Sequence, residues 1–110
     1  LCRKATEWME ALQIFHEMAE DRVKRDTITF NATISACDKG RAWEPALRLV
    51  REMADHRVER STITFNAAIS SCKEGGVWIL AAQLLSEMVG GQVERNTITF
   101  NAALSACEKG

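Results

Sequence analysis

The sequence predicts an all-α protein, a solenoid of antiparallel helical hairpins that are each 35 residues long. The hexapeptide Thr-Ile-Thr-Phe-Asn-Ala stands unchanged at residues 27–32, 62–67 and 97–102. Tryptophan, methionine, valine and cysteine positions recur at the same spacing of 35 residues. A fixed period of about 20 to 50 residues is typical of solenoids, in which each unit buries its apolar face against its neighbours. Hydrophobic residues make up 46% of the chain, with six Gly and one Pro, a composition that favours packed helices.

Residues 1–26 are predicted to be a partial repeat. Leu1 to Lys4 should be the end of a first helix whose beginning is absent, because Cys2 aligns with Cys37 in the 35-residue register. From about Ala5 to Glu20, apolar residues recur at spacings of three and four, which indicates an amphipathic second helix. A turn then leads to the first complete unit.

Residues 27–61 are predicted to be a complete repeat. Its first helix should span about residues 28–39 and end at Gly40, since glycine favours helix ends. Its second helix should run from about Glu44 to Asp55, with Pro45 in the first turn, where the missing N–H costs no intrahelical bond. Hence this unit should be an antiparallel helical hairpin.

Residues 62–96 repeat this plan, with glycine pairs at 75–76 and 90–91 as the expected helix ends. Residues 97–110 supply only a first helix. That last helix keeps an apolar face, so we expect it to pack on a flanking repeat of the same protein outside this segment.

Charge and cysteine spacing exclude several classes of function. Lys and Arg total 14 against 15 Asp and Glu, a net charge of -1, which argues against strong nonspecific attraction to nucleic acid. No run of 18 or more apolar residues predicts a membrane span. Equivalent positions on stacked helices should be about 8 to 10 Å apart, beyond the roughly 7 Å Cα limit of a disulfide. We therefore expect small, buried, reduced thiols at Cys2, Cys37, Cys72 and Cys107.

No arrangement in the sequence predicts catalysis, a metal site or a cofactor. There is no C-x-x-C pair, and His16 and His56 fall at different places in the repeat, so no tetrahedral ligand set assembles. No nucleophile has an adjacent base, and no glycine-rich phosphate loop is present. We expect both histidines to be solvated and the segment to be non-catalytic, without a small-molecule ligand.

The 35-residue unit combines three features. It opens with Thr-Ile-Thr-Phe-Asn, its first helix ends near Lys-Gly, and its second helix carries Ala-Leu-x-Leu-x-x-Glu-Met at residues 46–53. In period and motif the chain resembles the pentatricopeptide repeat family over its whole length. The resemblance implies a right-handed solenoid in a mitochondrial or plastid protein that binds single-stranded RNA with its first helices, one base per repeat. It also implies an adaptor role in RNA processing, stability, editing or translation.

In the family, the residue after the aromatic of the opening motif and the last residue of the same repeat together choose the base. This implies that Asn31 pairs with Ser61, and Asn66 with Asn96, and both combinations resemble pairs that read pyrimidines. The remaining matches are two half-pairs, Asp26 and Asn101; three aliphatic residues that would clamp a base, Ile28, Ile63 and Ile98; and two phosphate-facing lysines, Lys39 and Lys109.

Each of these positions also has a purely structural interpretation. The repeat-ending residues Asp26, Ser61 and Asn96 are good helix N-caps, and the invariant asparagines could instead bond between helices of neighbouring repeats. The three tryptophans could stack on bases, although their place at the start of the second helix favours core packing.

A different class of function also remains open. The balanced charge, Glu74 at a phosphate-facing position, and the invariant asparagines suit a scaffold subunit that contacts proteins of a large organelle complex. A weaker alternative is an array that positions substrate for an enzyme domain elsewhere in the protein.

Overall fold

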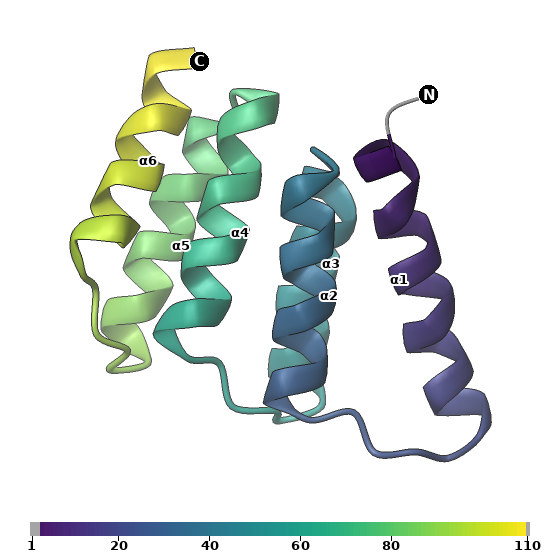
Figure 1. Cartoon of the computed structure of the whole chain (residues 1–110). Coiled ribbons are helices and arrows are strands. Elements are labelled where there is room, and N and C mark those ends of the chain that lie inside the picture. Colours follow the sequence, from purple (N-terminus) through teal and green to yellow (C-terminus); the bar gives the residue numbers. More distant parts are fainter. Residues whose placement is uncertain (1–2, 110) are drawn as a thin grey trace.

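The computed structural model describes residues 3–109, with the side chains of residues 7–73 and 75–108. It contains the helices α1 (Arg3–Glu20), α2 (Thr27–Lys39), α3 (Trp43–Asp55), α4 (Thr62–Gly75), α5 (Trp78–Gly90) and α6 (Thr97–Lys109) (Figure 1). No strand occurs among the described residues. The predicted all-α fold and its period are therefore confirmed.

The helices form two layers. The first helices α2, α4 and α6 contact one another in sequence order, and the second helices α1, α3 and α5 contact this layer. Figure 1 shows α2 and α4 in front of their hairpin partners α3 and α5. The molecule measures 40 × 38 × 19 Å, and its shortest dimension matches two layers of helices that are each about 10 Å thick. The described residues include no helix long and apolar enough to cross a membrane.

Each first helix begins after a side chain that caps it. The Oδ1 atom of Asp26 accepts a hydrogen bond of 3.1 Å from the backbone N–H of Thr29, and Asn96 does the same for Thr99 at 3.1 Å. Ser61 forms a capping box with Thr64, whose hydroxyl accepts the Ser61 backbone N–H at 3.1 Å. Free N–H groups at a helix start need such partners, so the predicted capping role is confirmed.

The helices end at residues in the left-handed region, and only one of these residues is a glycine. Second helices are followed by Arg22, Arg57 and Gln92, with φ near 60°, at equivalent places 35 residues apart. First helices are followed by Arg41 and Gly76, at φ 60° and 61°. Gly40 and Gly91 have negative φ. The predicted glycines Gly40, Gly76 and Gly91 are therefore the residues that cap the helix ends, but only Gly76 itself takes the left-handed conformation.

The N-terminal segment differs from the prediction. Arg3 and Lys4 belong to α1 instead of ending a separate first helix, whereas Leu1 and Cys2 lie outside the described residues. The reason is the sequence at the expected break. Where later repeats have Gly40-Arg41 or Gly75-Gly76, this segment has Ala5-Thr6, and alanine is the best helix former.

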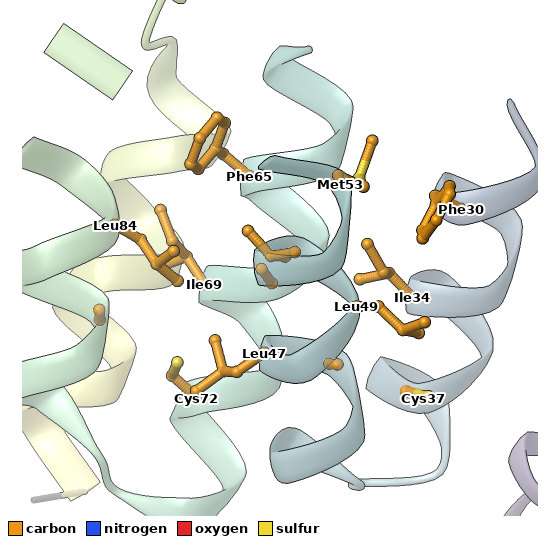
Figure 2. Packing of buried hydrophobic residues seen from close by; sticks show 14 of the residues in the cluster. Phe30, Ile34, Cys37, Leu47, Leu49, Met53, Phe65, Ile69, Cys72 and Leu84 are labelled. Atoms are coloured by element: carbon orange, nitrogen blue, oxygen red, sulfur yellow. The ribbon is translucent and has the colours of Figure 1, made fainter. Parts of the chain in front are cut away.

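Buried apolar side chains from both layers make one continuous core. In Figure 2, Leu49 of α3 lies next to Ile34 of α2, and Leu84 of α5 lies next to Ile69 of α4. All four side chains are buried, at 5% exposure or less. In each of these hairpins, a buried residue of the first helix thus lies next to the residue 15 positions later, on the second helix.

Most of the recurring tryptophans and methionines lie in the predicted core, and Trp78 is the exception. Met53 and Met88 are fully buried, and Trp8 and Trp43 are partly buried against the core. Trp78 is 48% exposed, so the core prediction is wrong for this side chain. Its equivalent Trp43 is covered because it packs on Gly75 of the next first helix.

The described cysteines are free thiols in two environments. Cys37 and Cys72 are buried, and loss of water contact raises the pKa of each thiol to about 11. Cys107 is exposed, which corrects the prediction that it is buried. Within the described residues, no second helix follows α6 to form a hairpin with it.

Candidate functional site

The structure brings together the two pairs of residues that the sequence singles out. The amide nitrogen of Asn66 donates to Oδ1 of Asn96 at 3.2 Å. The amide nitrogen of Asn31 lies 3.5 Å from the hydroxyl oxygen of Ser61, at the limit of a hydrogen bond. Each pair joins a residue early in a first helix to the residue that precedes the next first helix. The two pairs therefore lie along the first-helix layer.

Threonine hydroxyls fix the orientation of both asparagine amides. The hydroxyl of Thr64 accepts the backbone N–H of Ser61 and donates to Oδ1 of Asn31. The hydroxyl of Thr99 is placed in the same way between Asn96 and Asn66. In both pairs the amide oxygen of the asparagine faces the threonine hydroxyl, and the amide nitrogen faces the repeat-ending residue.

This geometry leaves one defined polar group of each asparagine for a ligand. Asn66 uses its oxygen toward Thr99 and one amide hydrogen toward Asn96. An amide nitrogen carries two hydrogens. The second amide hydrogen is left to donate to an acceptor atom on a bound group. The predicted inter-repeat hydrogen bond thus coexists with capacity to bind a ligand.

An apolar side chain accompanies each asparagine. Ile28, Ile63 and Ile98 are 78%, 67% and 65% exposed. Each isoleucine precedes the asparagine of its repeat by three positions, and residues three apart lie on the same side of a helix. Three exposed isoleucines at one repeat position cannot be explained by core packing. Their exposure fits the contact with a flat apolar group that the sequence predicts.

The remaining predicted site residues are not brought into pairs. Asp26 precedes α2 and Asn101 lies on α6, at opposite ends of the array (Figure 1). Lys39 is exposed in the last turn of α2. The side chains of Lys109 and Glu74 lie outside the described residues, so their predicted places beside a phosphate stay predictions.

Two sets of contacts were not predicted. The guanidinium carbons of Arg25, Arg60 and Arg95 lie 4.2, 4.9 and 5.1 Å from the ring centroids of Phe15, Phe65 and Phe100. The hydroxyls of Thr27 and Thr62 donate to the backbone oxygens of Glu59 and Glu94 at 2.7 and 2.6 Å. The 35-residue recurrence of these arginines and threonines was the available signal. Cation–π contacts of this kind stabilise by about 0.5–2 kcal/mol.

One arginine is also held by a carboxylate. Arg60 donates to Oε1 of Glu87 at 2.9 Å, and both side chains are partly exposed. The contact links α5 to the turn before α4. Because exposed ion pairs contribute only about 0–1 kcal/mol, its main effect is to orient Arg60 over Phe65.

Charge at the site is modest. Hydrogen bonds from Thr29, from its backbone N–H first and then its hydroxyl, lower the pKa of Asp26, so this carboxyl is ionised at neutral pH. His16 and His56 are exposed, as predicted. Within the described residues, no three His, Cys, Asp or Glu side chains cluster in a way that could hold a metal ion.

Comparison with known proteins assigns the repeat. The family model described as "Pentatricopeptide repeat domain" matches residues 2–41 and 44–109. A comparison with the curated proteins gives no match. Two similar solved structures are the pentatricopeptide repeat protein PPR10 in complex with an 18-nt psaJ RNA element, and a triple cysteine-to-serine variant of it with the same RNA. For both, the TM-score is 0.85 and the sequence identity is 20%. The match covers 94% of this chain and 15% of the PPR10 chain. At this sequence identity, the similarity shows that the chain shares the fold of these structures.

Proposed function

The chain belongs to the pentatricopeptide repeat family, and on that premise we propose that it binds single-stranded RNA along its first-helix layer. Each repeat would meet one base. The similar structures of PPR10 hold an RNA element, which supports an RNA ligand for this chain as well. The adaptor role and a place in a mitochondrion or plastid belong to the same proposal.

The observation that carries the proposal is the repeated group of an exposed isoleucine, an oriented asparagine and a repeat-ending polar residue. Ile63 and Ile98 would contact the two faces of a base, because apolar side chains exclude water from it. The remaining amide hydrogen of Asn66 would donate to an acceptor on the base edge. Cytosine and uracil each present a carbonyl oxygen there, so the group suits the predicted pyrimidine preference.

Electrostatic attraction should contribute little to this binding. The net charge is -1, and Lys39 is the described lysine that the family pattern places at a phosphate. For single strands, the slope of log affinity against log salt is about -0.7 per neutralised phosphate. We therefore expect a shallow salt dependence, and Lys39→Gln should reduce the slope by about 0.7.

A fluorescence anisotropy titration of the chain with C-rich, U-rich and A-rich single-stranded RNA at several salt concentrations tests the proposal. The expected result is tighter binding of the pyrimidine strands, with a shift toward purine for Asn66→Thr. Ile79→Glu is a matched control, because Ile79 is exposed on α5 and the equivalent residue of α3 is Glu44. Absence of binding at low salt, where attraction is least screened, would overturn the proposal.

One observation also favours a scaffold function. The exposed isoleucines form an apolar row, and such patches mark protein contacts as well as ligand sites. If the chain binds no RNA but Ile63→Asp abolishes its incorporation into a protein complex, the row is a protein-binding surface. RNA binding weakened by the same substitution supports the primary proposal.

A further inference from the structure

Two equivalent grooves lie between neighbouring second helices, one of them open and the other closed. The open groove, between α1 and α3, has a volume of about 280 Å³, and its lining includes Trp8, Leu12, His16, Pro45, Arg48 and Glu52. The groove between α3 and α5 has a volume of about 10 Å³. In both places the two second helices contact the first helix between them. The difference in volume therefore comes from the side chains.

Smaller side chains account for the open groove. Pro45 stands where Leu80 stands in the closed groove, and His16 stands where Arg51 stands. Leu80 packs against the core, and a proline ring in its place reaches less far across the space between the helices. Removing apolar atoms from a packed contact leaves a cavity unless the helices move together. The opening is thus encoded by these two residues, inside the array.

The carboxylate of Glu52 lacks the partner that its equivalent has. In the closed groove, Glu87 accepts a hydrogen bond of 2.9 Å from the guanidinium of Arg60. The residue equivalent to Arg60 is Arg25, but its guanidinium carbon lies 4.2 Å from the ring centroid of Phe15. Glu52 is partly exposed, and it forms no hydrogen bond or ion pair with another described residue.

One difference in the core explains why Arg25 does not pair with Glu52. Phe15 is the equivalent of Val50, and both side chains are buried. The face of an aromatic ring attracts a cation at least as strongly as an exposed carboxylate does. The ring of Phe30 also lies 5.8 Å from the Arg25 guanidinium carbon. Two rings therefore hold Arg25, and the carboxylate in the open groove is left for an external group.

The chemistry of the open groove suits an arginine side chain. Trp8, Leu12 and Leu49 supply apolar surface along which an aliphatic stem can pack. Glu52 can accept two parallel hydrogen bonds from the planar guanidinium at the end of such a stem. The equivalent Glu87 already holds a guanidinium in this way, with one hydrogen bond. Because pockets for small-molecule ligands measure about 300–1,000 Å³, the smaller volume of this groove fits one long side chain.

We propose that the groove between α1 and α3 binds an arginine side chain of a partner polypeptide. The partner takes the place that Arg60 takes at the next junction. Arg60 belongs to residues 56–61, the segment that connects α3 to α4, so a non-helical stretch of polypeptide is the form in which the array itself presents this group. The groove lies in the second-helix layer, whereas the candidate RNA site lies along the first-helix layer (Figure 1). The inference therefore does not depend on RNA binding.

A second charge in the groove narrows the sequence of the partner. Arg48 lines the groove, is exposed, and forms no ion pair with another described residue. It precedes Glu52 by four positions on α3, but an exposed ion pair at this spacing is weak, so it competes little with an incoming arginine. An acidic residue beside that arginine would pair with Arg48 and offset the repulsion between the two cations. We expect the partner to carry an arginine next to Asp or Glu.

An NMR titration of the isotope-labelled chain with two dipeptide probes tests the guanidinium site. The probes are acetyl-arginyl-glutamate amide and its citrulline analogue, in which a neutral urea of the same shape replaces the guanidinium. At millimolar concentration and constant ionic strength, the arginine probe should shift the indole N–H of Trp8 and backbone amides of α1 and α3. It should bind about tenfold more tightly than the citrulline probe, because a charged donor strengthens the hydrogen bonds. Equal binding of both probes, or shifts that avoid the groove, would overturn the site.

Two variants separate the role of the carboxylate from that of the cavity. Glu52→Gln should remove the difference between the probes, because a neutral amide does not favour a cation. Pro45→Leu should weaken both probes, since it restores the residue that stands in the closed groove, and leucine is a good helix former. Glu44→Gln is the control, because Glu44 is an exposed residue of α3 outside the groove lining. Far-UV circular dichroism verifies folding, and a Glu52→Gln chain that still prefers the arginine probe would contradict the proposal.

Peptides selected by phage display distinguish a polypeptide partner from a free guanidinium compound. A random library selected on the unaltered chain, with binders of Pro45→Leu removed, should yield peptides that contain an arginine next to an acidic residue. Their synthetic forms should bind at least about tenfold more tightly than the dipeptide probe, because flanking residues add buried contacts. Peptides no tighter than the probe would reject a polypeptide partner, and RNA that shifts the groove amides would assign the groove to nucleic acid instead. Failure of RNA binding in the anisotropy titration would leave this site unaffected.

Discussion

The hydroxyl of Thr64 donates its one hydrogen to the amide oxygen of Asn31 in the preceding repeat. The same hydroxyl accepts the backbone N–H of Ser61, so it connects a helix cap to a neighbouring helix. Thr64 is fully buried. The threonine and the asparagine of the opening motif thus need each other: the threonine of one repeat bonds to the asparagine of the preceding repeat, 33 residues earlier.

Thr64→Val should lower the free energy of unfolding by about 1–3 kcal/mol, because it leaves the Asn31 oxygen and the Ser61 N–H without their partner. Thr33→Val is the control. The Thr33 hydroxyl donates to the Thr29 backbone oxygen, four residues earlier within α2, and that oxygen keeps its helical N–H. Its loss should cost less than about 1 kcal/mol, because no buried polar group is left without a partner. Urea unfolding of both variants provides the measurement, and equal losses would contradict the role of Thr64.

Gly75→Ala should destabilise the chain by about 1 kcal/mol or more, although alanine normally favours a helix. A Cβ atom at Gly75 would lie 2.5 Å from Nε1 and 2.6 Å from Cδ1 of Trp43. In a Trp43→Leu background the same change should be neutral or stabilising, which gives a coupling energy of about 0.5–3 kcal/mol. Gly90→Ala is the control, since a Cβ there meets nothing within 4 Å. Thermal unfolding of the four-variant cycle measures the coupling, and additive effects would exclude the contact.

Arg57→Gly should stabilise the chain by about 1 kcal/mol. Arg57 has φ 57° after α3, a conformation that costs a residue with a Cβ about 1–2 kcal/mol and suits glycine. Arg57→Ala removes the same charge but keeps the Cβ, so it should give no gain. The comparison of their midpoints in thermal unfolding separates backbone strain from charge, and equal stabilisation by both would point to charge.

Asp26→Asn should remove one acid-sensitive contribution to stability and leave the cap in place. The folded state lowers the pKa of Asp26 below its ordinary value of 3.8. Its contribution is therefore present above about pH 4 and lost as the pH falls through the lower folded value. Asparagine caps helices as well as aspartate does. The stability difference between the two chains should change only below about pH 4, and a difference confined to neutral pH would contradict this role.

Thiol labelling should distinguish the cysteines. Iodoacetamide at neutral pH should modify exposed Cys107, whereas buried Cys37 and Cys72, with pKa values of about 11, should react only on unfolding. Mass spectrometry of the peptides gives the sites. Because a folded thiol with a raised pKa stays neutral, its contribution to stability holds below about pH 9 and is lost as the pH rises toward 11. Replacement of both buried thiols by alanine should remove this alkaline component.

The 35-residue period was sufficient to predict the helices, because the same apolar positions recur in successive repeats. It failed where one repeat differs from the others. Arg3 and Lys4 join α1 because Ala5 and Thr6 replace the usual break, and Cys107 is exposed because no second helix follows α6 in the described part of the chain. Neither effect is visible in the averaged pattern.

The residues of the candidate site could be predicted from the sequence, but the hydrogen bonds between them could not. The resemblance to the family implied that Asn66 and Asn96 act together, and in the structure the amide nitrogen of Asn66 lies 3.2 Å from Oδ1 of Asn96. The resemblance gave no indication that Thr99 fixes the orientation of the Asn66 amide, because the threonine also suits a helix start on propensity alone. Likewise, Arg95 over Phe100 depends on the path of a turn, which a repeat period does not define.

The caps of the first helices bear on how this protein can change over evolutionary time. Asp26, Ser61 and Asn96 occupy equivalent places and each begins a helix equally well. Drift among these three residue types is therefore close to neutral for folding, while the asparagine and threonine around them are constrained by each other. Selection on whatever the surface contacts can act at this one position in each repeat, and a new preference can arise by a single substitution without a compensating change elsewhere.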